Sequence, residues 1–197
     1  MAEEIAKTNP EGLLTLIRAL LRPIQAEHMI SVAEQPEHQA PHEINYLFFF
    51  FHLNRIAESS EFYLRHKPEI HIDLSKDIVL PTPWHRGRYS DALACIGDGK
   101  KLGSWRQDSN HSLAVWLPWR ISFVMGGNHS ITAGILQGEG KIVANEVFDL
   151  TPLFDRVICD GQTYKETKTG RIIEKVNDPR RAAVFEIGRL IKKSKIC

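Results

Sequence analysis

The segment from Arg120 to Phe148 constrains the fold most, because a pair of glycines within it separates a strand pattern from a helix pattern. Residues 120–125 alternate with the two-residue period of a strand that buries one face. Gly126 and Gly127 follow directly. Glycine adopts backbone conformations that other residues avoid, so this pair predicts a sharp turn at the end of the strand.

A helix pattern begins immediately after this turn. Asn128 is a favourable capping residue, and apolar residues recur at helical spacing between Ile131 and Leu136. Gly138 and Gly140 predict the end of the helix, since glycine accommodates the left-handed conformation of a helix stop. A second strand is predicted from Lys141 to Phe148.

This strand, turn and helix together predict an anion site. The first amides of a helix have no acceptor within the helix and lie at the positive end of its dipole. Glycines without Cβ let an anion approach, and His129, Ser130 and Thr132 add side-chain donors. The alternative is a structural turn in which His129 caps a neighbouring group or faces water, and the spacing leaves both interpretations open.

Two runs in this half of the chain resemble one protein superfamily. The run VMGGNHSITAGILQGEGKIVANEV is similar to the central motif of the ParB/sulfiredoxin superfamily, where a strand ends in a Gly-x-His or Gly-x-Arg turn before a small helix. The upstream run HIDLSKDIVLPTPWHRGR resembles that superfamily's first strand and basic loop. The resemblance covers residues from Ile70 to Asp155.

The resemblance implies that this turn binds a nucleotide. Members bind ATP or CTP there, and the Osa-type fertility inhibition proteins of conjugative plasmids, a branch of similar size, are linked with ATPase and DNase activity. We therefore expect ATP or another nucleotide and Mg²⁺ as cofactors, with metal ligands that the sequence does not identify. By the same resemblance, His129 and Arg88 are the candidate catalytic residues. The candidate nucleotide-binding residues are Arg86, Arg88, Gly126, Gly127, Asn128, His129, Ser130 and Thr132.

The departures from the superfamily exclude two of its activities. Sulfiredoxin chemistry requires a cysteine just before the turn histidine, and Asn128 stands at that place. Partition proteins carry an arginine-rich turn and a downstream helix-turn-helix, whereas Ser130 follows His129 and no recognition helix is predicted after it. Of the activities that the resemblance implies, nucleotide binding is the one still expected. Whether the chain hydrolyses the nucleotide or DNA is an open question.

Composition bounds the class of protein. The hydrophobic share of 43% and the charged share of 25% are typical of a globular chain, and a net charge of +1 lacks the excess of an avid nucleic-acid binder. Three widely spaced cysteines and an acidic N-terminus without a hydrophobic core predict a reducing, cytoplasmic location. The apolar run at 47–51 is too short to span a bilayer, so no membrane span is expected.

The remaining elements are predicted from periodicity and from capping residues. A helix opening at Asn9-Pro10 is expected to kink or end at Pro23, and a stiff basic loop is expected at 81–88, with a solvated loop as its alternative. The other predicted elements are a helix at 41–66, a strand at 71–80, a helix at 91–96 capped by Ser90, strands at 157–159, 163–167 and 171–176, and a helix starting at Asp178-Pro179.

Two further sites are weaker candidates. His38 and His42 have a spacing that shares a helix face, but Pro41 lies between them and the pattern of a zinc protease is absent. Cations from Arg180 to Lys195 could hold DNA or could simply complement the dipole of the last helix.

These observations predict an α+β fold in which a ParB/sulfiredoxin-like mixed sheet with small helices is flanked by N-terminal and C-terminal helices. An N-terminal helical region, 1–69, would pack on a domain at 70–197 that ends in a β-meander and a helix. One functional hypothesis is an ATPase or DNA nuclease that blocks conjugative DNA transfer. The alternative is a non-catalytic, nucleotide-dependent module that docks a protein of the transfer apparatus or another partner, and a third interpretation involves no nucleotide.

Overall fold

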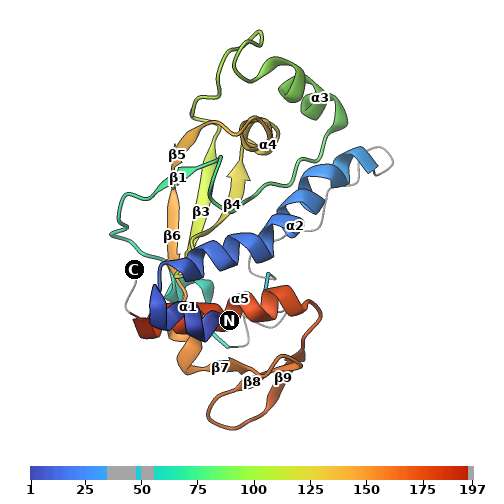
Figure 1. The fold of residues 1–197 in the computed structure, drawn as a ribbon. Helices are drawn as coiled ribbons and strands as arrows, with labels where there is room; N and C mark the ends of the chain where they lie inside the picture. The colour runs from blue at the N-terminus through green and yellow to red at the C-terminus, as the bar shows by residue number, and fades with distance from the viewer. Residues whose placement is uncertain (35–47, 50–55, 195–197) are drawn as a thin grey trace.

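The computed structural model describes residues 1–34, 48–49 and 56–194, and Figure 1 shows their arrangement. The α-helices are α1 (Ala2–Thr8), α2 (Gly12–Glu34), α3 (Arg86–Cys95), α4 (Asn128–Gln137) and α5 (Pro179–Ser194), with short 3-10 helices η2 (Ser59–Glu61) and η3 (Thr151–Asp155). The strands are β1 (His71–Asp73), β2 (Val79–Leu80), β3 (Ser112–Leu117), β4 (Ile121–Gly126), β5 (Lys141–Val143), β6 (Glu146–Asp149), β7 (Val157–Cys159), β8 (Thr163–Glu166) and β9 (Ile172–Lys175). The α+β class with helices at both ends is confirmed.

A four-stranded mixed sheet of order β2-β4-β3-β6 forms the centre of the molecule. β3 and β4 pair antiparallel as a hairpin, while β2 runs parallel to β4 and β6 runs parallel to β3. β1 and β5 form a separate antiparallel pair, and β7, β8 and β9 form the predicted meander. In Figure 1, α3 and α4 lie at one end of the central sheet, and α1, α5 and the meander lie at the other.

The single strand predicted at 141–148 is in fact two strands in two sheets. Asn145 explains the division, because its side-chain oxygen accepts from the Leu113 amide at 3.0 Å while its own amide donates to the Leu113 carbonyl at 2.9 Å. The backbone thus leaves β1 and joins β3 at this residue. The predicted strand at 71–80 divides in the same way, at a turn spanning Asp73 to Asp77.

Both ends of the chain share one hydrophobic core. Leu13, Ile17 and Leu21 of α2 are buried in the same cluster as Phe185 and Ile191 of α5. A second cluster, between the sheet and α4, contains apolar residues of β3, β4 and α4. Residues on both sides of the predicted boundary at 69/70 therefore pack together, and the division into 1–69 and 70–197 stays a prediction.

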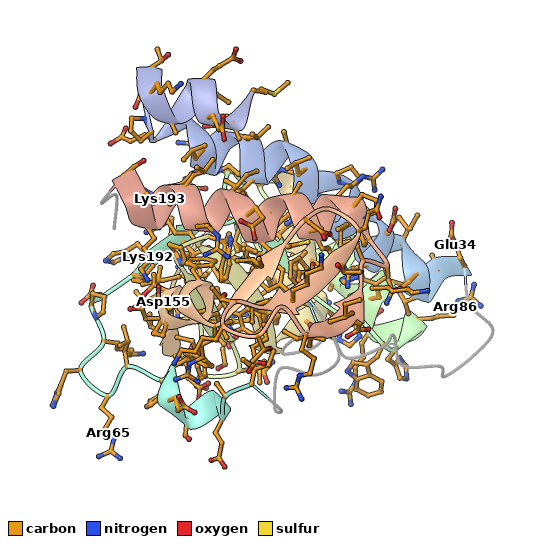
Figure 2. All side chains as sticks on the ribbon, turned by 90° about the horizontal axis from the view of Figure 1, so that it is seen from below. Glu34, Arg65, Arg86, Asp155, Lys192 and Lys193 are labelled. Atoms are coloured by element: carbon orange, nitrogen blue, oxygen red, sulfur yellow. The ribbon has the colours of Figure 1, made fainter. Side chains whose placement is uncertain are left out.

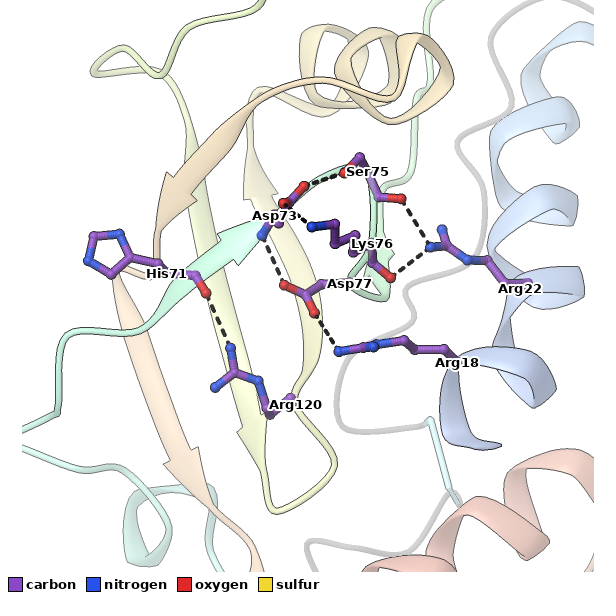
Figure 3. A network of polar contacts seen from close by, with 8 residues as sticks. All are labelled: Arg18, Arg22, His71, Asp73, Ser75, Lys76, Asp77 and Arg120. Atoms are coloured by element: carbon purple, nitrogen blue, oxygen red, sulfur yellow. Dashed lines mark hydrogen bonds and ion pairs between the residues drawn. The ribbon is translucent and has the colours of Figure 1, made fainter. Parts of the chain in front are cut away.

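A polar network fixes α2 to the turn between β1 and β2 (Figure 3). Arg18 pairs with the Asp77 carboxylate at 3.2 Å, and Arg22 donates to the Lys76 carbonyl at 2.7 Å. Nearby, the buried Gln25 donates to the Val79 carbonyl at 2.6 Å. Buried polar groups are costly unless they are paired, so these contacts specify where α2 lies against the sheet.

Two expectations for the N-terminal half need correction. α2 continues through Pro23, so the proline does not end the helix, and a kink there stays a prediction. Of the helix predicted at 41–66, residues 41–47 and 50–55 lie outside the described part of the chain, and residues 56–66 hold a 3-10 turn and a β-bridge at Tyr63 in place of an α-helix. The isolated bridge from Tyr63 pairs this segment with Phe148, and Phe48 and Phe49 are buried in the core.

The predicted basic loop at 81–88 is also partly wrong. α3 begins at Arg86, because the Nδ1 atom of His85 accepts from the Arg88 amide at 3.2 Å and caps the helix. Ser90 is therefore an interior residue of α3 and not its cap. Both arginines of the motif consequently belong to a helix.

Candidate functional site

The start of α4 has the geometry that the glycine pair predicts. β4 ends at Gly126, and Gly127 takes a left-handed φ of 78° as the residue before the helix. No side chain caps this end of α4. Among the described residues, the amides of Asn128, His129 and Ser130 have no hydrogen-bond acceptor. Three donors at the positive end of a helix of ten residues are therefore available to an anion.

The two glycines are required by protein packing. A Cβ atom on Gly127 would lie 2.3 Å from Cδ2 of His111, and one on Gly126 would lie 2.7 Å from the Asn110 carbonyl oxygen. From the sequence, the missing Cβ atoms were expected to let an anion approach. In the structure, the turn before β3 occupies the space beside both glycines. Glycine thus brings His111 against the start of α4.

Asn128 and His129 hold the segment that precedes α3. The Asn128 side-chain oxygen accepts from the Thr82 amide at 2.6 Å and from the Thr82 hydroxyl at 3.3 Å. Nε2 of His129 accepts from the amides of His85 at 3.1 Å and Trp84 at 3.4 Å. The two motifs that carried the sequence resemblance are therefore hydrogen-bonded to each other.

His129 functions in these contacts as a neutral ring. Burial lowers its pKa, and the charges of Arg88 and His85 lower it further. An acceptor nitrogen that faces two amide donors would lose both bonds on protonation, so the geometry agrees with this direction. His129 therefore has a structural role on this side of α4, whatever ligand binds beside it.

Ser130 lies on the other side, facing a different histidine. Its Oγ atom is 2.5 Å from Nε2 of His111, and Nδ1 of His111 lies 2.9 Å from the Asp108 amide and 3.2 Å from the Asp108 carboxylate. The His111 side chain is almost fully buried, and burial lowers its pKa although the Asp108 charge opposes this. A cavity of about 210 Å³ is lined by Asp108, His111 and Ser130, with Trp105 and Arg106.

The other predicted site residues occupy different places. Thr132 is buried, and its hydroxyl donates to the Asn128 carbonyl at 2.7 Å. Arg86 donates to the Ala33 carbonyl at 2.9 Å, and Figure 2 shows it beside Glu34 at the end of α2. Arg88 is exposed, with its guanidinium 5.3 Å from the centre of the Trp84 ring. Of the two arginines, Arg88 is therefore the one near α4.

The cations of α5 are mostly paired within the protein. Arg189 bonds the Glu186 carboxylate and the carbonyls of Phe154 and Val157, and Lys192 pairs with Asp155 at 2.9 Å (Figure 2). Arg181 likewise pairs with Asp178 at 3.3 Å. These contacts give the basic residues a packing role, and a DNA-binding role for them stays a prediction.

Residues 1–34, 48–49 and 56–194 contain neither a cluster of metal ligands nor a membrane-spanning helix. No group of three or more histidine, cysteine or acidic side chains there is arranged to hold a metal ion, and His38 and His42 lie outside this part of the chain. No helix among the same residues has the length and apolar character needed to cross a bilayer.

His111 is the residue that the sequence interpretation missed. The sequence does carry a signal for it, because the triplet Asn110-His111-Ser112 repeats the triplet Asn128-His129-Ser130. No curated protein and no solved structure matches the chain. The match to the family of unknown function DUF6710 spans residues 1–197, and the chain therefore belongs to that family.

Proposed function

We propose that the chain is a nucleotide-binding protein that holds the phosphate groups of ATP at the N-terminus of α4. The observation that carries this proposal is the row of three amides, from Asn128 to Ser130, without an acceptor among the described residues. Phosphate oxygens accept from such amides, and the helix dipole favours their negative charge.

Charges on both sides of this helix end support the proposal. Arg88 is exposed and close enough to His129 to lower the pKa of that ring. Arg106 lines the cavity at Ser130, and it has no ion pair with another described residue. Two guanidinium groups thus flank the amides, and guanidinium geometry suits phosphate oxygens.

A ParB/sulfiredoxin-like core is part of the same proposal. Its support is the order of strand, glycine turn and small helix, together with the hydrogen bonds from Asn128 and His129 to the segment before α3. In this arrangement the phosphate would lie where the superfamily binds its nucleotide.

Two activities are compatible with this pocket. In the first, Mg²⁺-dependent ATPase or DNase activity serves to block conjugative DNA transfer. In the second, the pocket holds nucleotide without turnover and controls docking to a partner protein. The contacts of His129 favour the second, because its Nε2 already accepts from two backbone amides and cannot also take a proton from water.

The substitution Asn128→Asp tests nucleotide binding most sharply. The carboxylate can still accept from the Thr82 amide, and a negative charge at this position stabilises a helix. It would, however, repel phosphate. We expect calorimetry with Mg-ATP to show an affinity at least about 10-fold weaker, equivalent to about 1.4 kcal/mol, with an unchanged or higher melting temperature.

Gln137→Glu is the matched control, because it adds the same charge at the exposed far end of α4. Its affinity for ATP should equal that of the wild type. Absence of heat with ATP, CTP and GTP would contradict nucleotide binding. Release of inorganic phosphate, or cleavage of linear DNA, by the wild type but not by Asn128→Asp would favour the enzyme over the binding module.

A further inference from the structure

Asp108, His111 and Ser130 form a continuous chain of polar contacts from a carboxylate through an imidazole to a hydroxyl. The carboxylate of Asp108 lies 3.2 Å from Nδ1 of His111, and Nε2 of the same ring lies 2.5 Å from Oγ of Ser130. Asp108 also accepts from the Asn110 amide at 2.8 Å, which fixes the turn that carries the histidine. This order of groups is the one that activates a serine hydroxyl as a nucleophile.

The ring has a partner for its proton on either nitrogen. With the proton on Nε2, His111 donates to Ser130 and accepts from the Asp108 amide at 2.9 Å. With the proton on Nδ1, it donates to the Asp108 carboxylate, and Nε2 is then free to accept from the Ser130 hydroxyl. The second state is the reactive one. It requires the Asp108 amide, which donates to Nδ1 at 2.9 Å, to turn away from the ring, and the Ser130 hydroxyl to leave the Gly127 carbonyl, to which it donates at 3.2 Å.

The surroundings of Ser130 suit the chemistry of acyl transfer. Ser130 lies in the first turn of a helix that follows a strand and a glycine, and it lines the same cavity as Asp108 and His111. The neighbouring amides of α4 can stabilise an oxyanion on a carbonyl attacked by Oγ. His111 is only 4% exposed, so little of its ring faces water.

We propose that Ser130 is the nucleophile of a second activity, the hydrolysis of small carboxylic esters, with His111 as general base and Asp108 orienting the ring. The Oγ atom of Ser130 bonds to the carbonyl carbon while its proton passes to Nε2 of His111. The bond to the alcohol oxygen then breaks, and His111 returns the proton to that oxygen. Water cleaves the acyl-serine by the same route and releases the carboxylic acid.

This activity goes beyond nucleotide binding and does not rest on it. The cavity of about 210 Å³ limits the acyl group to a small one. An oxyanion would use the same amides as the proposed phosphate, so ATP should slow the reaction if both proposals hold. An esterase that ATP does not inhibit would keep the present proposal and contradict nucleotide binding at α4.

A fluorophosphonate probe tests the nucleophile directly on the full chain. Attack by Ser130 Oγ forms an oxygen–phosphorus bond, fluoride leaves with the bonding electrons, and His111 takes the proton. Mass spectrometry of the digested wild-type protein should place the adduct on Ser130. No adduct, or an adduct only on another residue, would overturn the proposal, and this result does not depend on the folding of any variant.

Variants then assign the role of each group. Ser130→Ala should abolish labelling, and His111→Ala should slow it at least about 100-fold, the usual contribution of a general base. The control is Ser104→Ala, because Ser104 lines the same cavity but contacts no histidine among the described residues. Release of 4-nitrophenol from 4-nitrophenyl acetate should follow the same order, and equal rates in all four proteins would contradict the proposal.

Discussion

The two sides of the first turn of α4 carry similar polar residues but differ in what those residues contact. On one side, the side chains of Asn128 and His129 accept from the backbone of residues 82–85. On the other side, Ser130 and His111 face a cavity. A polar side chain whose acceptors are saturated by backbone amides is structural, whereas one that borders a cavity can meet a ligand.

The same difference decides which histidine, His129 or His111, is available for the proposed chemistry. The sequence motif points to His129, because it lies directly after the glycine turn. The structure gives Nε2 of His129 two amide donors and gives Nε2 of His111 a hydroxyl at 2.5 Å. The motif therefore points to His129, whereas the proposed ester hydrolysis uses His111.

The largest expected effect concerns the packing that brings the two sides together. Gly127→Ala would place Cβ 2.3 Å from the His111 ring at a φ of 78°. Strain in the left-handed region costs about 1–2 kcal/mol and overpacking about 1–3 kcal/mol, so urea unfolding should show a loss of about 2–5 kcal/mol.

Gly138→Ala separates these two causes. Gly138 also has a left-handed φ, 68°, but no atom lies within 4 Å of its Cβ position. Only the strain of about 1–2 kcal/mol should remain. Equal losses at the two glycines would show that His111 does not pack against the turn as described.

Removing the structural histidine should have the next largest effect. His129→Ala leaves the amides of Trp84 and His85 without their acceptor, which costs about 1–2 kcal/mol for partly exposed groups. Hydrogen exchange should accelerate at residues 84 and 85 and stay unchanged in β8. Uniform acceleration over the whole chain would argue against a local role for this ring.

A smaller effect distinguishes the two arginines. Arg88→Ala should weaken the affinity for ATP about 5-fold, equivalent to about 1 kcal/mol, because one exposed cation is lost near the phosphate. Arg86→Ala should leave the affinity unchanged, since its guanidinium bonds the Ala33 carbonyl at the end of α2. If Arg86→Ala weakened the affinity for ATP more than Arg88→Ala in calorimetry, the phosphate would lie near Arg86 and not near Arg88.

The smallest effect is a shift in titration. Burial lowers the pKa of both His111 and His129 below the ordinary 6.5, and it lowers the pKa of His28 to about 4. Below pH 6.5 the unfolded chain binds protons that these folded rings resist, so the contribution of these three rings to the free energy of unfolding is constant above about pH 6.5 and falls as the pH decreases. For His28 the fall extends to about pH 4, and NMR of the ring protons should resolve each midpoint.

An NMR midpoint above 6.5 for His111 would contradict a buried neutral ring. The rate of fluorophosphonate labelling offers a second reading of the same group. It should stay constant from high pH to below pH 6.5 and decrease only when His111 is protonated.

Local patterns predicted much of this fold. The strand before Gly126, the helix near Asn128 and its end at Gly138 occur at the predicted places. Residues 121–124 are all buried, however, whereas the alternation predicted one buried face, and Gly127 stands at the capping position expected for Asn128. The meander and the last helix also follow from short-range signals. These elements form through interactions between residues that are close together in the sequence, so local patterns are enough to predict them.

Features set by distant contacts were not predictable in the same way. The division of residues 141–148 into two strands depends on Asn145 pairing with Leu113, and the start of α3 depends on a side-chain cap from His85. The approach of His111 to Ser130 joins residues on two separate elements. No local sequence pattern indicates such a contact, so the cavity and the position of His111 beside Ser130 could not be predicted from the sequence.

The most direct test of the phosphate site is an NMR titration of the ¹⁵N-labelled chain with Mg-ATP. The largest shifts of backbone amides should occur at Asn128, His129 and Ser130, whose N–H groups lack an acceptor among the described residues. Largest shifts at another place, such as a cavity lined by Arg156, Lys168 and Arg171, or no shifts at all, would contradict the phosphate site at the start of α4.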